Sequence, residues 1–345
     1  MQTYSTRFPL VSVVITGKNV EKYLEKCLTS LLQQSYPLLE ITYIDAGSLD
    51  NSAEIAKKFG AKVIVDFSAR TPGQGRNLGL KVAKGKVIAF LDADCCAPPN
   101  WIGTLTTSLL SNKKYGGVGG SYLPLNPSTF ESVIYFVFST FLGSGGALQA
   151  MRFSDPKKPP KEVESIPAGN AAYRRVVLER VGGFNPHLRF CEDYDLNLRI
   201  KKLGYNIINH PKASVYHLKT YTPISFFENM FFYGWGRAKA MSNNAKLLKF
   251  VHAVPSLFLF SLVVLSILSI LNSFFLLLLE FEVALYLVAI LASVSKIVLG
   301  VDGFGLKLKV LGLAPFTYII QHLAYGVGFF TAILSEMVRK LIGGS

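Results

Sequence analysis

The sequence has few residues of the kinds that define disulfide-rich or zinc-finger proteins. Only four cysteines occur among its 345 residues, and their positions lack the spacing of a zinc site. They are Cys27, Cys95, Cys96 and Cys191. Adjacent cysteines rarely form a good disulfide framework, so we expect four reduced thiols. Reduced thiols are typical of a domain on the cytosolic side of a membrane.

Positive charge is plentiful, but it is not gathered into a basic patch. The sequence holds 36 Lys and Arg against 22 Asp and Glu, a net charge of +14, scattered along the chain without a nucleic-acid-binding motif. We therefore expect no nucleic-acid partner. A basic protein with apolar segments fits an anionic membrane surface and anionic substrates better. No basic region followed by a long apolar core opens the sequence, so we expect no cleaved signal peptide.

Formally charged residues are absent from residues 251–279, a run long enough to cross a bilayer core of about 30 Å. Two glutamates follow this run, and shorter apolar segments cover residues 283–300 and 310–335. These three segments predict an α-helical transmembrane region over residues 251–345. A buried core helix is the alternative for each segment.

The charges that flank these segments predict an orientation. If the N-terminal part lies in the cytoplasm, the second segment returns to Lys307 and Lys309 on the inside, as the positive-inside rule prefers. We therefore predict a multi-pass protein of the cell membrane with a cytoplasmic head. An outward third crossing would place Arg339 and Lys340 outside, so a tilted, re-entrant or in-plane third segment is the alternative.

Strand and helix patterns alternate in the N-terminal part. The strand-like runs are residues 11–16, 41–44, 62–65 and 86–91, and helical patterns fall between them. Such alternation predicts a Rossmann-like, doubly wound and mostly parallel α/β sheet. Ligands of these sheets bind outside the carboxyl ends of the strands, where Asp45 and Asp92 fall.

Two aromatic-rich amphipathic stretches complete the predicted organisation. Residues 130–142 and 223–240 are too short or too polar to span a membrane and suit the headgroup region, with ordinary core helices as the alternative. We predict an α/β domain over residues 1–222, amphipathic juxtamembrane helices over 223–250, and the transmembrane region beyond them.

Asp92 and Asp94 are the first candidates for chemistry. They follow a hydrophobic strand, and residues two apart on an extended backbone point to the same side. The two carboxylates can therefore share one site, where hard oxygen ligands suit Mg²⁺ or Mn²⁺ that also binds substrate phosphates. Asp-x-Asp pairs are also common in plain turns, which is the alternative.

Five motifs occur in the order found in one enzyme family. They are Thr16-Gly17-Lys18-Asn19, Ser35-Tyr36-Pro37, Ile44-Asp45-Ala46-Gly47-Ser48-Leu49-Asp50, Gly75-Arg76-Asn77-Leu78-Gly79 and Phe90-Leu91-Asp92-Ala93-Asp94. In this order the chain resembles the family 2 glycosyltransferases of the GT-A fold. Gly169-Asn170, Gly182-Gly183-Phe184 and Glu192-Asp193 extend the resemblance into the acceptor half.

The resemblance implies a donor site. Asp45 and Arg76 would contact the nucleoside or its phosphates, together with the loop of Thr16, Lys18 and Asn19. This loop departs from the family, because Thr16 replaces a proline and Lys18 a tyrosine. Read from the residues alone, Asp45 before Gly-Ser shapes a turn instead.

The resemblance also assigns the carboxylates of the aspartate pair. Asp94 would be the direct metal ligand, and Asp92 would reach the ribose or a metal-bound water. His217 is a candidate third metal ligand or a contact of the diphosphate, although a lone histidine is more often structural.

The resemblance further implies an acceptor site. Asp193, or its neighbour Glu192, would be the general base that takes a proton from the acceptor hydroxyl, with inversion at the anomeric carbon. Gly169 and Asn170 would belong to the acceptor loop. An acidic first turn also favours a helix dipole, which is the structural alternative for Glu192 and Asp193.

Two apolar elements narrow the resemblance. Tyr233-Gly234-Trp235-Gly236-Arg237 and the stretch from Gln321 to Gly328 look like elements of the succinoglycan glucosyltransferase ExoA group. Arg237 would contact phosphate or acceptor and Trp235 would line the active-site loop. Trp235 is equally suited to anchor the chain at a membrane interface.

Together these features predict a metal-dependent inverting transferase that uses Mg²⁺ or Mn²⁺ and a UDP- or GDP-sugar. Its partners would be membrane lipids and a lipid-linked saccharide whose hydroxyl accepts the sugar. The alternatives are a polyprenyl-phosphate monosaccharide synthase, a processive polymer synthase and a catalytically silent scaffold. The paired Glu192 and Asp193 favour a hydroxyl acceptor, because a polyprenyl phosphate is already ionised and needs no base.

Overall fold

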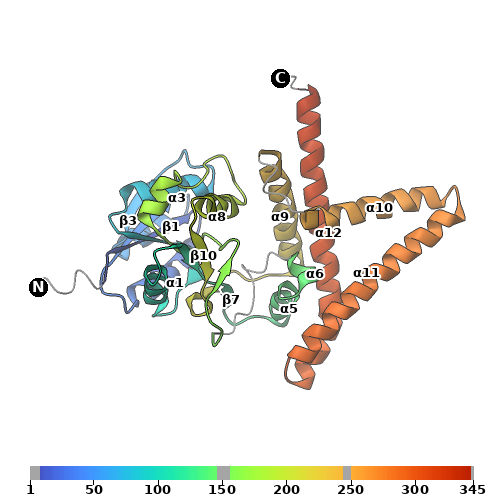
Figure 1. Ribbon diagram of the computed structural model, residues 1–345, viewed down its shortest axis with the longest axis horizontal. Coiled ribbons are helices and arrows are strands. Elements are labelled where there is room, and N and C mark those ends of the chain that lie inside the picture. Colours follow the sequence, from blue (N-terminus) through green and yellow to red (C-terminus); the bar gives the residue numbers. More distant parts are fainter. Residues whose placement is uncertain (1–7, 146–155, 244–249, 343–345) are drawn as a thin grey trace, which may run out of the picture. The chain divides into compact units, whose positions relative to one another are not determined.

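The computed structural model describes residues 8–145, 156–243 and 250–342 (Figure 1). The chain forms two compact units. The first contains Met1–Leu125 and Gln149–Lys219, and the second contains Asn126–Leu148 and Thr220–Ser345.

An eight-stranded mixed sheet forms the centre of the first unit, in the order β3-β2-β1-β4-β9-β6-β10-β8. Its strands are β1 (Val11–Gly17), β2 (Leu39–Asp45), β3 (Lys62–Val65), β4 (Val87–Asp92), β6 (Tyr115–Gly119), β8 (Lys161–Val163), β9 (Asn170–Arg174) and β10 (Asn206–Asn209). The four strands predicted from the sequence are the parallel half, β1 to β4. Beyond them, β9 runs antiparallel to both β4 and β6, and β8 runs antiparallel to β10. β6 and β10 pair in parallel and run in the same direction as β1 to β4, so the sheet is mostly parallel, as predicted.

Helices cover this sheet on both faces, as the doubly wound prediction requires. They are α1 (Glu21–Leu32), α2 (Ser52–Lys58), α3 (Pro72–Val82), α4 (Trp101–Leu110), α7 (Arg175–Arg180) and α8 (Glu192–Lys202). One core cluster packs α1 and α4 against β1 and β4, and a second packs residues of α3, α7 and α8 against the other face. Thr71 caps α3 by accepting a hydrogen bond from the Gln74 amide at 3.2 Å, and Pro72 suits its first turn.

A second, three-stranded sheet lies beside the end of β4. It consists of β5 (Cys95–Cys96), β11 (Val215–His217) and β7 (Tyr122–Pro124), in the order β5-β11-β7. His217 pairs with Cys95 on one side and with Pro124 on the other. This small sheet therefore brings three distant parts of the chain to the loop that follows β4.

The second unit is helical. It contains α5 (Thr129–Phe138), α6 (Phe141–Ser144), α9 (Pro223–Asn243), α10 (Val254–Ser269), α11 (Ser273–Gly300) and α12 (Phe304–Ile342). The aromatic-rich stretch 130–142 forms α5 and α6, whose Val133 and Val137 pack into a cluster with α11 and α12. The predicted segment 223–250 forms α9 up to Asn243, and residues 244–249 lie outside the described residues.

Two of these helices, α11 and residues Phe304–Arg339 of α12, are long and apolar enough to cross a membrane. In the most apolar window of α11 only 6% of the residues are buried, which a core helix of a soluble protein would not show. α10 is apolar but has only 16 residues. The structure thus offers two helices of spanning length where the sequence predicted three segments.

The first apolar run ends earlier than predicted. The helix break lies between Ser269 and Ser273 rather than at the two glutamates, because Asn272 caps α11 by accepting a hydrogen bond from the Phe274 amide at 2.9 Å. Glu282 lies inside α11, where its carboxylate accepts a hydrogen bond from the Ser261 hydroxyl of α10. Glu282 therefore does not end the helix, because the Ser261 hydroxyl satisfies its carboxylate.

Glycines allow α9 and α12 to approach each other closely. A Cβ atom at Gly234 of α9 would lie 2.0 Å from the Tyr325 carbonyl oxygen, and one at Gly328 of α12 would lie 2.0 Å from that of Phe231. Small residues at a helix crossing let the two backbones meet. The two apolar motifs noted in the sequence are therefore the two sides of one helix contact.

We expect Gly328→Ala to destabilise the second unit by about 1–3 kcal/mol, because the added methyl group meets backbone that cannot move aside cheaply. Gly312→Ala is the matched control in the same helix, since a Cβ there has open space. Alanine favours helix over glycine by about 1 kcal/mol, so this control should be neutral or stabilising. Thermal denaturation of the full chain in detergent compares the two, and equal midpoints would contradict the close contact.

Candidate active site

The carboxyl ends of three parallel strands meet at one edge of the large sheet. Thr16 of β1 lies opposite Asp92 of β4, and Gly17 lies opposite Asp45 of β2. Parallel pairing in this register aligns the ends of neighbouring strands, so the two aspartates fall on the same edge. Three of the predicted site residues are thereby brought together.

The loops after β1 and β2 are tied to each other. The Asn19 side chain accepts a hydrogen bond from the Leu49 amide at 2.8 Å, and the Asn19 amide donates to the Ser48 hydroxyl at 2.9 Å. Asp45 is buried and accepts hydrogen bonds from the Ser48 amide, at 3.1 Å, and from its hydroxyl. Asp45 and Asn19 therefore hold the shape of this loop pair, and Lys18 lies exposed beside them.

Arg76 of α3 forms ion pairs with two carboxylates. Its guanidinium lies 3.1 Å from Asp92 at the end of β4 and 2.7 Å from Glu192 at the start of α8. The same guanidinium lies 5.5 Å from the centre of the Phe184 ring. These contacts tie the sheet edge to α3 and to the N-terminus of α8.

Burial and charge act together on this cluster. Burial lowers the pKa of Arg76, but the charges of Asp92 and Glu192 raise it by more, so Arg76 stays charged. Burial raises the pKa of Glu192 to about 7, with Arg76 opposing the shift and Asp193 adding to it. Because two carboxylates share one guanidinium, Glu192 is less stabilised as an anion than a carboxylate with its own partner would be.

Asp193 follows Glu192 in the first turn of α8 and is half-buried. Its carboxylate accepts a hydrogen bond from the Tyr194 amide at 2.7 Å, while its carbonyl accepts one from the Asn197 side chain at 2.8 Å. Of the two adjacent acids, it is Glu192 that binds Arg76.

Asp94 pairs with His217 across the small sheet. The Nε2 atom of His217 lies 3.3 Å from the Asp94 carboxylate. Burial raises the pKa of the Asp94 carboxyl, but His217, a backbone hydrogen bond and Lys219 together leave this pKa below its usual value. Burial lowers the pKa of His217, but Asp94 and Asp92 together leave this pKa above its usual value. A carboxylate and an imidazole at this separation suit a divalent cation, whose donors at about 2.0–2.2 Å lie roughly 3 Å apart.

Tyr122 of β7 contacts both Asp92 and His217. The sequence did not single it out as a site residue. Its hydroxyl donates to Asp92 at 2.8 Å, and its ring meets that of His217 edge-on at 5.8 Å between centres. Tyr122 and Asp92 are 30 residues apart and meet through the small sheet, so no spacing in the sequence relates them. With Arg76 on one oxygen and Tyr122 on the other, both oxygens of Asp92 are engaged.

The sequence of this chain matches a known protein family. The model of the family "Glycosyl transferase family 2" matches residues 12–182, which include the strand edge, Arg76 and both aspartates of the pair. The chain carries a family 2 glycosyltransferase domain. The match ends before Glu192, Asp193 and His217, whose roles therefore stay predictions.

Two curated relatives have similar sequences. Glycosyltransferase AglE of Haloferax volcanii is 27% identical over 216 residues, 59% of this chain and 65% of its own length. The probable glycosyltransferase YdaM of Bacillus subtilis is 26% identical over 219 residues, 59% of this chain and 50% of its own length. The chain thus spans half to two thirds of the length of these relatives. The narrower resemblance to the ExoA group stays a prediction.

A solved structure shares the fold. The mannosyltransferase PcManGT of Pyrobaculum calidifontis, in complex with GDP-Man and Mn²⁺, superposes with a TM-score of 0.53 and 17% identity, covering 99% of this chain and 89% of that one. The family 2 domain therefore has the GT-A fold that the motifs predicted.

Gly169 contacts Asp92, and Asn170 forms hydrogen bonds in the core of the family 2 domain. The Gly169 carbonyl accepts a hydrogen bond from the Asp92 amide at 3.0 Å, and a Cβ at Gly169 would lie 1.8 Å from the Asp92 carboxylate. Asn170 is fully buried, accepts from the Trp101 indole at 2.8 Å and donates to the Ser121 carbonyl at 3.1 Å. The Asn170 side chain thus holds the core, and a place for Gly169 in an acceptor loop stays a prediction.

Trp235 and Arg237 belong to α9 of the second unit, outside the family 2 match. The Lys239 ammonium lies 5.2 Å from the centre of the Trp235 ring. Contacts of Trp235 with an acceptor and of Arg237 with a donor or acceptor stay predictions.

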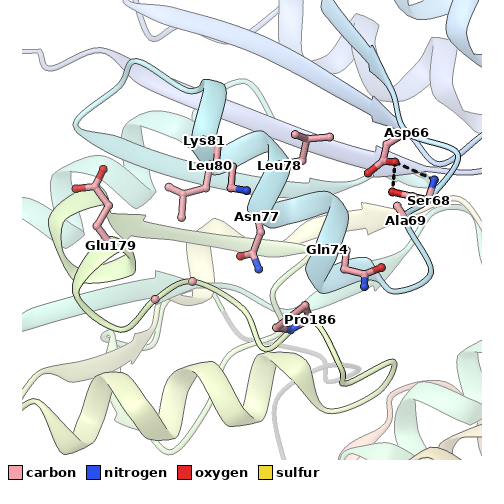
Figure 2. Close-up of a pocket in the computed structure, with 12 residues that line it drawn as sticks. Asp66, Ser68, Ala69, Gln74, Asn77, Leu78, Leu80, Lys81, Glu179 and Pro186 are labelled. Atoms are coloured by element: carbon pink, nitrogen blue, oxygen red, sulfur yellow. Dashed lines mark hydrogen bonds between the residues drawn. The ribbon is translucent and has the colours of Figure 1, made fainter.

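A groove of about 450 Å³ runs along α3 of the family 2 domain (Figure 2). Gln74, Asn77 and Lys81 of α3 line one side, and Asp66 lies at one end, where it accepts hydrogen bonds from the Ser68 amide and hydroxyl. Among the described residues that line it are none of the carboxylates that contact Arg76. The groove is therefore separate from the Arg76 cluster.

We expect Arg76→Ala to destabilise the first unit by about 3–5 kcal/mol, because it leaves Glu192 and Asp92 without their shared cation. Lys57→Ala removes an ion pair with Glu54 whose side chains are 58% and 72% exposed, so it should cost at most about 1 kcal/mol. Urea denaturation of the full chain, followed by tryptophan fluorescence, measures both. Similar midpoints for the two variants would contradict a central role for Arg76.

Proposed function

We propose that this chain is a metal-dependent, inverting glycosyltransferase that transfers a sugar from a nucleotide-sugar donor to a hydroxyl of a lipid-linked glycan. The observation that carries this proposal is the arrangement around Arg76, which joins the end of β4, inside the family 2 match, to the start of α8, which follows that match. In this proposal Asp94 serves the donor phosphates and Asp193 serves the acceptor hydroxyl.

Asp94 and His217 would hold the divalent cation, Mg²⁺ or Mn²⁺. A cation there supplies positive charge to the nucleoside diphosphate that leaves. The complex of PcManGT with GDP-Man and Mn²⁺ supports a divalent cation and a nucleotide-sugar donor for this chain. Asp92, whose two oxygens bind Arg76 and Tyr122, has a positioning role in this arrangement.

Asp193 is the proposed general base. Its carboxylate takes the proton of the acceptor hydroxyl while the hydroxyl oxygen bonds to the anomeric carbon and the bond from that carbon to the diphosphate breaks. Attack from the face opposite the leaving group inverts the anomeric configuration. Glu192 is bound to Arg76 at 2.7 Å, so its part is to fix the start of α8 and thereby the position of Asp193.

The helical unit supports a membrane-bound acceptor. α11 exposes a long apolar surface, and α12 begins with Lys307 and Lys309 near its start, as expected for an end on the cytosolic side. A lipid-linked saccharide would be presented at that surface. We therefore propose that the family 2 domain acts on the cytosolic face of the cell membrane.

We expect Asp193→Asn to reduce sugar transfer to a polyprenyl-linked saccharide by about 10²–10⁴-fold, the usual contribution of a general base. The donor should still bind, because Asp193 does not contact it in the proposed arrangement. Transfer by the purified full chain would be measured over a panel of UDP- and GDP-sugars, with donor binding measured by calorimetry.

The same assay with bare polyprenyl phosphate separates the alternative functions. Transfer to this ionised acceptor that is unaffected by Asp193→Asn would indicate a polyprenyl-phosphate synthase. Long polymer as product would indicate a processive synthase. Failure of all donors to react or hydrolyse would overturn the proposed activity.

A further inference from the structure

A third metal-binding side chain lies beside Asp94 and His217. The ligand atoms of Asp94, Cys95 and His217 all lie within 4.8 Å of one another. The Cys95 thiol donates to the Asp94 carboxylate at 3.8 Å, and Cys95 is paired with His217 between β5 and β11. Neighbouring donors of a tetrahedral Zn²⁺ site, at about 2.0–2.3 Å from the ion, lie roughly 3.3–3.8 Å apart. The set is therefore already close to the spacing that one cation requires.

Asp92 is poorly suited to be the third ligand. One of its oxygens accepts from Arg76 at 3.1 Å and the other from Tyr122 at 2.8 Å. A cation on either oxygen would share the charge of this carboxylate with the donor already bound there, Arg76 or Tyr122. Asp94 already lies next to His217 and Cys95, and a cation held by the three would take the place of the protons through which they contact its carboxylate.

The chemistry of these donors favours a particular class of cation. Mg²⁺ prefers oxygen ligands in octahedral geometry, whereas sulfur and imidazole donors favour Zn²⁺ and Co²⁺. We propose that Cys95 is a protein ligand of the metal in this site and that the site therefore binds zinc-class transition-metal ions in preference to Mg²⁺. This inference deepens the proposed function, on which it rests for the use of the site.

The chain contains a matched control next to Cys95. Cys96 is the second residue of the two-residue strand β5, so its side chain points to the opposite face of the small sheet. Cys95 is fully buried, whereas Cys96 is half-buried. A substitution at Cys96 changes the same backbone and the same residue type but leaves the donor set intact.

The test is a Co²⁺ titration of the purified full chain, without donor or acceptor, followed by absorption spectroscopy. We expect a thiolate-to-cobalt charge-transfer band in the wild type and in Cys96→Ser, and none in Cys95→Ser. Loss of a supporting outer-shell partner alone costs about 10–100-fold in metal affinity, so loss of this ligand should weaken Co²⁺ binding at least as much. Excess Mg²⁺ should not displace Co²⁺ from the wild type.

Several results would overturn the inference. They are the absence of the band in the wild type, its persistence in Cys95→Ser, or displacement of Co²⁺ by equimolar Mg²⁺. If Cys95→Ser does not fold, cadmium NMR of the wild type still decides the matter, because a sulfur ligand moves the ¹¹³Cd resonance away from the range of all-oxygen sites. Since no sugar donor is present, failure here is distinct from failure of the transferase proposal.

Discussion

The guanidinium of Arg76 binds two carboxylates, both of which follow it in the sequence at very different separations. Asp92 is 16 residues from Arg76 and Glu192 is 116 residues from it. A planar guanidinium offers several donors in a fixed geometry, so it can bind both carboxylates at once. Removing the charge would leave a buried acid without compensation, and for this reason the sheet edge, α3 and α8 depend on one another.

This arrangement divides the acidic residues by role. Asp92 and Glu192 are bound to Arg76, and Tyr122 holds the second oxygen of Asp92. Asp94, two residues later, contacts His217 instead. The small sheet makes the difference, because β5 and β11 bring His217 to Asp94 while Tyr122 remains beside Asp92. A single Asp-x-Asp tripeptide therefore takes part in two networks, which Tyr122 connects.

Local patterns in the sequence were sufficient to predict the parallel half of the sheet. The β-branched runs of β1 and β4 are buried on both faces, and strand ends carry ligands in any sheet of this kind, so Asp45 and Asp92 could be placed at one edge. The close contact of α9 with α12 also left a signal, since glycines occur in both motifs. The helix break before α11 also left a signal in the sequence, because asparagine, here Asn272, is a favoured helix cap.

The partners of the site residues could not be predicted in the same way. Arg76 was expected to contact the donor, and nothing in its neighbourhood along the chain indicates that Glu192 would bind it. Tyr122 lies in a strand of three residues and Cys95 in a strand of two residues. Such strands are too short to show a periodic pattern. Side-chain networks formed between distant segments depend on packing that local sequence does not encode.

The most direct test of this account measures Mn²⁺ binding by electron paramagnetic resonance in the presence of a nucleoside diphosphate, for Asp94→Asn and Asp92→Asn in parallel. Asparagine at position 92 keeps one acceptor oxygen for Arg76, and its NH₂ group can donate to the hydroxyl oxygen of Tyr122 instead. We therefore predict that this variant binds Mn²⁺ nearly as tightly as the wild type. Asp94→Asn should weaken binding by about 100-fold or more, as loss of a direct ligand should exceed loss of an outer-shell partner. The opposite order of the two variants would contradict the account.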